Sequence, residues 1–280
     1  MKWLYRPLYN MLTAGETIDT LRRTIRRLEP RRLLPIADYI QEAATTDDDV
    51  RKIANEYRQL AAIPELTSIA LKPSSFRFNA NIIGDLIGEF VAHKKRVFVD
   101  AEEAVHHARI CDITNTCMKT HNVGDVPHVY KTYQMYRRDS VAALTEDIER
   151  IPCLGIKLVR GAYWNQDRQS GELFEVKQDT DAAFRQALQL ILKKEPRGLL
   201  HAMICTHNPA DIQYMIDNNP RDGRIAHASL YGFIENETQR IQAAAIPTYK
   251  YLPYGAMDDA IPYLLRRIRE NPRVLRYYLM

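Results

Sequence analysis

The chain has 280 residues, of which 46% are hydrophobic and 26% charged, the composition of an ordinary globular protein with a large core. Its 39 Lys and Arg against 35 Asp and Glu leave a net charge of +4, an excess too small to indicate nucleic-acid binding. The four cysteines form no Cys-x-x-Cys pair and no apolar run is long enough to cross a membrane, so neither a disulfide framework, a zinc site nor a transmembrane helix is predicted.

Eight short apolar runs, each ending in a polar residue or a turn, predict eight β-strands. They lie at residues 33–39, 66–72, 96–100, 128–134, 154–160, 199–206, 224–230 and 247–252. The stretches between them have helical periodicity, for example 82–95, 181–194 and 210–219, and a further helix is predicted at 18–28. Alternating strands and helices imply parallel pairing, so we expect one (βα)8 barrel domain over residues 1–280, with a doubly wound open sheet as the alternative.

A last helix is predicted over residues 260–271, with Asp258 and Asp259 at its start and Pro262 in its first turn. Four residues at helical spacing share one face of it: Tyr263, Arg266, Arg267 and Glu270. Such a face is usually solvated, but guanidinium groups also bind carboxylates through two parallel hydrogen bonds. Because the helix follows the eighth strand closely, we expect this face to turn towards the mouth of the barrel.

Polar residues end several predicted strands, where a barrel enzyme has its active site. They are Asp38, Lys72, Asp100, Arg160, residues 206–208 and Tyr251. After Arg160, two small residues would let a flat ligand approach the backbone, and the two aromatic residues that follow would stack on it or pack. Asp100, the acidic residues and histidines at 102–107, and His207 leave a metal-dependent hydrolase or lyase as an alternative. Carboxylates at a helix N-terminus explain much of that cluster without a metal.

Taken in order, these segments resemble the proline dehydrogenase family of flavoenzymes, including the dehydrogenase part of bifunctional proline-utilization proteins. The resemblance rests on LTAGET, ADYIQE, ALKPS, VDAEEA, TYQMY, GIKLVRGAYW, THN and YLPYG with YLLRRIREN. It covers nearly the whole chain, and the ordered set is far more specific than any single motif. It implies a (βα)8 barrel that holds FAD at the C-terminal ends of its strands.

The resemblance also implies an activity, the oxidation of L-proline to Δ1-pyrroline-5-carboxylate by hydride transfer to flavin N5. The electrons would pass to a membrane quinone and the product to a separate pyrroline-5-carboxylate dehydrogenase. The protein would then be cytoplasmic and peripheral on the inner face of the membrane, or mitochondrial in a eukaryote, with no metal and no nucleic-acid partner. A degenerate barrel that binds flavin without turnover is a third possibility.

The resemblance assigns the substrate carboxylate to Arg266, Arg267 and Lys72. Three cations at one point are costly without an anion, which predicts a water, a counter-ion or a neighbouring carboxylate before the substrate binds. Glu42 would pair with the arginine helix and gate the site.

The resemblance places a second set of residues beside the proline ring. Asp100 and Tyr251 would lie next to the ring, and Leu230 would pack on its apolar carbons. Tyr263 would crowd the C4 atom and so favour proline over 4-hydroxyproline.

For FAD, the resemblance implies contacts by fifteen residues of this sequence. The positions are Asp100, Ala101, Lys157, Val159, Arg160, Gly161, Ala162, Tyr163, Trp164, Thr180, Thr206, His207, Asn208, Arg267 and Glu270. Lys157 is the expected cation beside the reduced flavin. Lys131 stands at the strand-four position that is often glutamine in the family, which predicts one altered flavin contact.

Overall fold

A computed structural model describes residues 5–41, 44–193 and 199–270, with side chains described within these ranges as far as Arg266. Its eight strands are all parallel, pair in chain order, and close into a barrel where β8 pairs with β1. The strands are β1 Leu34–Tyr39, β2 Ser68–Leu71, β3 Arg96–Val99, β4 Val129–Gln134, β5 Cys153–Val159, β6 Leu199–Cys205, β7 Ile225–Leu230 and β8 Thr248–Tyr254. The predicted (βα)8 barrel is confirmed, because an open doubly wound sheet would have two free edges.

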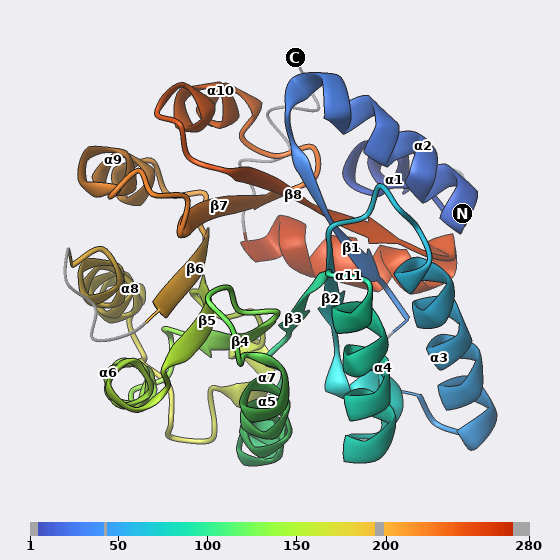
Figure 1. Ribbon diagram of the computed structural model, residues 1–280, viewed down its shortest axis with the longest axis horizontal. Helices are drawn as coiled ribbons and strands as arrows, with labels where there is room; N and C mark the ends of the chain where they lie inside the picture. The colour runs from blue at the N-terminus through green and yellow to red at the C-terminus, as the bar shows by residue number, and fades with distance from the viewer. Residues whose placement is uncertain (1–4, 42–43, 194–198, 271–280) are drawn as a thin grey trace.

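Helices follow the strands and form an outer ring, with α11 drawn behind the strands instead of in the ring (Figure 1). The α-helices are α1 Arg6–Leu12, α2 Ile18–Leu28, α3 Asp47–Ala61, α4 Ala80–Ala92, α5 His107–His121, α6 Ser140–Arg150, α7 Trp164–Asp167, α8 Lys177–Ile191, α9 Pro209–Asn218, α10 Glu235–Ala243 and α11 Met257–Glu270. Short 3-10 helices in the described part of the chain include η2 Glu29–Arg31, η3 Pro73–Phe76 and η4 Ala104–His106. Side-chain caps define several starts, including Thr46 before α3 and Asn208 before α9.

The interior of the barrel is filled by apolar side chains up to the level of its mouth, the end where the strands terminate. This plug consists of Ile36, Ala70, Phe98, Tyr130, Met203, Ala226, Ala228 and Tyr249. Alternate residues of a strand face the same side, so Lys157 and Tyr251 extend the interior stack towards the mouth. The polar residues of the mouth therefore rest on a closed, water-excluding floor.

The last helix begins at Met257, three residues before its predicted start. Asp258 and Asp259 lie in its first turn instead of preceding it, and Pro262 lies inside the helix. Acidic residues favour the helix dipole in a first turn as much as they favour a cap, so the sequence signal fits either placement. Pro262 has no N–H, so one hydrogen bond to the carbonyl of Asp258 is missing from the start of this helix.

Candidate active site

Three side chains form a hydrogen-bonded group at the barrel mouth, which we call the Lys157 group: Asp100 directly after β3, Lys157 of β5 and Tyr251 of β8. Lys157 Nζ lies 2.5 Å from Asp100 Oδ1, and Tyr251 Oη donates to Asp100 Oδ2 at 2.9 Å. Lys157 Nζ also lies 4.9 Å from the centre of the Tyr251 ring. Burial, with the charge of Asp100 adding to it, raises the pKa of Tyr251 well above its usual value. The phenol thus keeps the proton that it donates, and one carboxylate fixes both a lysine and a tyrosine.

A second charged group, the Lys72 group, consists of Lys72, Asp38, Tyr263 and Arg266. Lys72 is 3% exposed and forms an ion pair with Asp38, which is fully buried at the end of β1. Lys72 Nζ and Arg266 Cζ each lie 6.0 Å from the centre of the Tyr263 ring. The structure thus brings together Lys72, Tyr263 and Arg266, as expected for a carboxylate-binding site. Asp38 is the neighbouring carboxylate that such a set of cations predicts.

Glu102 is absent from the predicted site, but its hydrogen bonds hold the turn that begins after Lys72, residues 73–76. Its carboxylate accepts hydrogen bonds from the Ser74 backbone N–H at 2.9 Å and from Ser74 Oγ. Ser75 Oγ donates to the Gln41 carbonyl at 2.9 Å. Glu102 is 3% exposed, and burial raises its pKa to about 7. The loops after β1, β2 and β3 are therefore linked beside Lys72.

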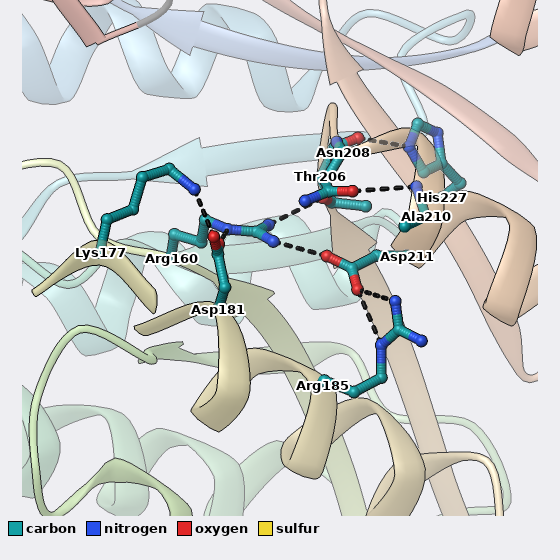
Figure 2. A network of polar contacts seen from close by, with 9 residues as sticks. All are labelled: Arg160, Lys177, Asp181, Arg185, Thr206, Asn208, Ala210, Asp211 and His227. Atoms are coloured by element: carbon teal, nitrogen blue, oxygen red, sulfur yellow. Dashed lines mark hydrogen bonds and ion pairs between the residues drawn. The ribbon is translucent and has the colours of Figure 1, made fainter. Parts of the chain in front are cut away.

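Arg160, directly after β5, turns towards α8 and α9 and joins a network of polar contacts (Figure 2). Its guanidinium donates to Asp181 at 2.7 Å, to Thr206 Oγ1 at 2.9 Å and to Asp211 at 2.5 Å. Arg185 donates to the same Asp211 carboxylate at 2.5 Å. The charge of Arg160 is thus balanced within the protein, and the residue also orders the segment that begins at Thr206.

The segment 206–208 joins β6 to the N-terminus of α9. Thr206 Oγ1 accepts from the Asn208 backbone N–H at 3.1 Å, and the Asn208 side chain caps α9. His207 stacks on Phe233 at 5.0 Å, and its Nε2 accepts from the Leu230 N–H at 3.4 Å. A helix N-terminus at the mouth of a barrel presents backbone N–H groups suited to a phosphate.

The turn between β5 and α7 contains Gly161, Ala162, Tyr163 and Trp164. Gly161 has a φ of +126°, and a Cβ there would lie 2.4 Å from the ring of Tyr136, so only glycine fits. Tyr163 is 8% exposed, whereas Trp164 is 41% exposed and its indole N–H reaches the carbonyl of Phe174. Of the two aromatic residues, Tyr163 is therefore the buried one and Trp164 the exposed one.

The other residues of the predicted site fall into two sets. The described ones are Ala101 in the loop after β3, Val159 and Leu230 facing the interior at the ends of β5 and β7, and Thr180, buried in α8. Glu42 and the side chains of Arg267 and Glu270 lie outside the described residues, and their roles stay predictions.

The expectation that Lys131 alters a flavin contact is wrong. Its Nζ lies 2.6 Å from Asp147 of α6, on the helix-facing side of β4. Thr132 pairs with Lys157 in the register, so Thr132 and Gln134 face the interior. Gln134 is 3% exposed and is the polar residue of β4 nearest the mouth. It is missing from the predicted site. Strand alternation could have found it, because Gln134 ends β4 and faces the same side as Thr132.

Two further groups near the mouth carry no charge at neutral pH. Burial raises the pKa of Cys205 to about 12 and lowers that of His227 to about 4. The described residues include no group of three His, Cys, Asp or Glu side chains that could hold a metal ion. The Cys205 thiol is therefore protonated at neutral pH and is not a ready thiolate nucleophile.

Comparison with known proteins identifies the family to which this chain belongs. Residues 21–276 match the model of the family described as Proline dehydrogenase. Hydroxyproline dehydrogenase of Xenopus laevis is 29% identical over 204 residues, which are 66% of this chain and 44% of that protein. Mitochondrial proline dehydrogenase 1 of Homo sapiens is 29% identical over 199 residues, 65% of this chain and 33% of that protein. The chain thus spans less than half the length of these two relatives.

Among solved structures, proline utilization A of Bdellovibrio bacteriovorus superposes with a TM-score of 0.85 at 17% identity. The superposition covers 95% of this chain and 33% of that one, and at this identity it shows the fold alone. Because the family model matches most of the sequence, this chain belongs to the proline dehydrogenase family.

Proposed function

We propose that the protein oxidises L-proline to Δ1-pyrroline-5-carboxylate with FAD and passes the electrons to a quinone. The observation that carries the proposal is the placement of the Lys72 group and the Lys157 group at one barrel mouth. The first offers cations to a carboxylate, and the second offers a cation to the reducible end of a flavin. Membership of the family supports the substrate class.

The donors around the mouth fit FAD. Arg160 uses three of its five N–H groups on described residues, which leaves two for a phosphate, and the N-terminus of α9 adds backbone N–H groups. Gln134 adds an amide, and the remaining positions matched to the family's FAD contacts would supply further contacts. When bound, FAD supplies the two-electron oxidant, with hydride passing from proline C5 to flavin N5.

The protein's own part in this chemistry is to bind and orient proline. Arg266 and Arg267, with Lys72, bind the carboxylate, and this fixes the direction of the ring. Lys72 is balanced by Asp38 before proline arrives, so the free site carries no uncompensated lysine charge. Tyr263, which is 4% exposed, lies beside both described cations, and its bulk would exclude a hydroxyl at C4.

The Lys157 group and its surroundings complete the proposed site. Asp100 holds the ammonium of Lys157 in place, so that it can stabilise negative charge on the reduced flavin. Tyr251 keeps its proton at Oη. Leu230 and Tyr251 pair at the ends of β7 and β8, and in the proposed site both contact the proline ring. We propose that Glu42 pairs with the arginine helix and closes the site.

Electron delivery to a quinone requires an approach to a membrane. We therefore propose peripheral association with the inner face of the cytoplasmic membrane, or a mitochondrial location in a eukaryote. Among the described residues, no helix is both long and apolar enough to cross a bilayer. We propose that the product passes to a separate pyrroline-5-carboxylate dehydrogenase.

An anaerobic titration tests the proposal. The purified protein is loaded with FAD, and the visible flavin absorbance should bleach when L-proline is added. An Arg266→Met variant should keep the flavin and lose most of the response, while Arg58→Met, an exposed position on α3, should behave as wild type. Failure to bind FAD would overturn the proposal. Bound FAD that proline does not reduce would favour a flavin-binding barrel without turnover.

A further inference from the structure

The junction between β8 and α11 is held by residues near the start of the chain. Tyr9 Oη donates to the Gly255 carbonyl at 2.7 Å. The Ala14 N–H donates to the Pro253 carbonyl at 2.7 Å, and the Gly255 N–H donates to the Gly15 carbonyl at 3.0 Å. We call Tyr9, Thr13, Ala14 and Gly15 the N-terminal brace, since three hydrogen bonds tie them to residues about 240 positions later.

The N-terminal brace is buried and internally ordered. Tyr9 and Ala14 are each 2% exposed, and burial raises the pKa of Tyr9 to about 12, so its Oη keeps the proton it donates. Thr13 Oγ1 donates to the Tyr9 carbonyl at 2.8 Å and accepts from the Gly15 N–H at 3.3 Å. Gly15 has a φ of +95°, and a Cβ there would lie 2.4 Å from Thr20, so glycine is required. These hydrogen bonds and the low exposure show that residues 9–15 are packed firmly against the barrel.

The junction is held on its other side by the barrel. The Tyr254 carbonyl accepts from the Ile40 N–H at 3.0 Å, at the end of β1. Gly255, with a φ of +140°, then turns the chain into α11. Because Pro262 removes one hydrogen bond from the start of α11, the direction of the helix depends on how the junction is held.

The direction of α11 sets the distance of Tyr263 and Arg266 from Lys72. Lys72 belongs to the barrel, whereas Tyr263 and Arg266 belong to α11, and the ring of Tyr263 lies 6.0 Å from both cations. Helix α1, which carries Tyr9, also packs against α11. A rotation of α11 about the junction would separate its arginine from Lys72 without changing either side chain.

We propose that Tyr9 is a positioning residue for proline binding, which sets the direction of α11 and so the distance between Arg266 and Lys72. The proposal rests on the proposed function, in which α11 carries the arginines that bind the carboxylate. Only molecules with α11 in this direction bind proline, so the apparent affinity falls with the fraction of molecules in that state. Flavin binding should depend on Tyr9 less than proline binding does, because only Arg267 and Glu270 of the fifteen expected FAD positions lie on α11.

The test uses the whole FAD-loaded protein and the variant Tyr9→Phe, which removes one hydroxyl. Tyr5→Phe is the matched control, since Tyr5 precedes α1 and is 38% exposed. A second variant, Thr13→Val, keeps the shape of the side chain but removes both Thr13 hydrogen bonds of the N-terminal brace. Three quantities are measured for each: amide hydrogen exchange of residues 257–266, the KM and kcat for proline, and the affinity for FAD.

For Tyr9→Phe we expect faster amide exchange in residues 257–266. The proline KM should rise about threefold to tenfold, because that factor corresponds to the loss of one buried hydrogen bond. The kcat and the FAD affinity should change less than the proline KM, and Thr13→Val should change the same quantities in the same direction. Binding of tetrahydrofuran-2-carboxylate, which keeps the ring and carboxylate but cannot be oxidised, should weaken in parallel with KM.

Three results would overturn the proposal. One is unchanged exchange in α11, another is faster exchange in α11 with an unchanged KM, and the third is a uniform rise in exchange over the whole barrel. If wild-type FAD is not reduced by proline, the proposed function fails instead. In that case the exchange experiment still decides whether Tyr9 holds α11.

Discussion

Glu102 offers the sharpest test of how the mouth of the barrel is built. Burial raises its pKa from the usual 4.5 to about 7, against the opposing effects of two Ser74 hydrogen bonds and the charge of Lys72. The native state therefore binds a proton here more tightly than the unfolded chain does. Stability should fall as pH rises from about 4.5 to about 7, and this contribution should be constant above that window. A shift of about 2.5 pKa units corresponds to roughly 3 kcal/mol of unfolding free energy.

The variant Glu102→Gln isolates this contribution. A glutamine stays neutral at every pH, and its amide can accept from the Ser74 N–H and donate to Ser74 Oγ. Urea unfolding of both proteins from pH 4 to 8 gives a difference in which most other titrating groups cancel. That difference should change by about 3 kcal/mol in favour of the variant as pH rises through the window. Glu103→Gln, at the next and more exposed position, is the control; a flat difference for Glu102→Gln would refute the reasoning.

Three further changes test the proposed site. Arg266→Met should weaken proline binding by about 2–5 kcal/mol, the cost of losing one charged contact to a bound carboxylate; an unchanged proline KM would contradict that role. Tyr263→Ser should raise kcat/KM for 4-hydroxyproline relative to proline, and an unaltered ratio would count against crowding at C4. Asp167→Asn should weaken FAD binding about tenfold in a flavin fluorescence titration, because this buried carboxylate accepts from the Ala104 N–H at 3.0 Å and from Tyr136 Oη at 2.9 Å. Wild-type FAD affinity in Asp167→Asn would show that this link between the loops after β3 and β5 does not shape the flavin site.

The barrel was predictable because its signals are periodic and repeated. Each strand is a short apolar run with a polar residue at its end, and errors of one or two residues at the ends do not change the number or order of strands. The same reasoning placed Lys72 and Asp100 at the mouth, since both directly follow strands. The start of α11 was less predictable, because Asp258 and Asp259 fit a cap and a first turn equally well.

The partners of the site residues were harder to predict than the residues themselves. Lys131 and Gln134 belong to one strand. Alternation puts them on opposite faces, and the register with β5 shows that Lys131 faces the helices and Gln134 the interior. Asp167 follows a conspicuous aromatic pair, but its bonds to distant loops leave no local pattern. Tyr9 is the extreme case, since its partner Gly255 is 246 residues away. Short-range periodicity carries no information about contacts of that kind.

The mouth of the barrel is charged but locally balanced. Lys72 is paired with Asp38, Lys157 with Asp100, and Arg160 with both Asp181 and Asp211. An uncompensated buried cation is expensive, so these carboxylates make it possible for the fold to hold the cations before any ligand binds.

The same balance sets a limit on affinity. In the proposed site, a substrate carboxylate that approaches Lys72 shares it with Asp38, so the free energy of binding is a difference between two ion pairs and not the full attraction of one. If the proposed site is correct, affinity for proline depends on the orientation of α11 as well as on the charges at the mouth. A substitution far from the mouth, such as one at Tyr9, would then weaken binding without changing any residue of the Lys72 group.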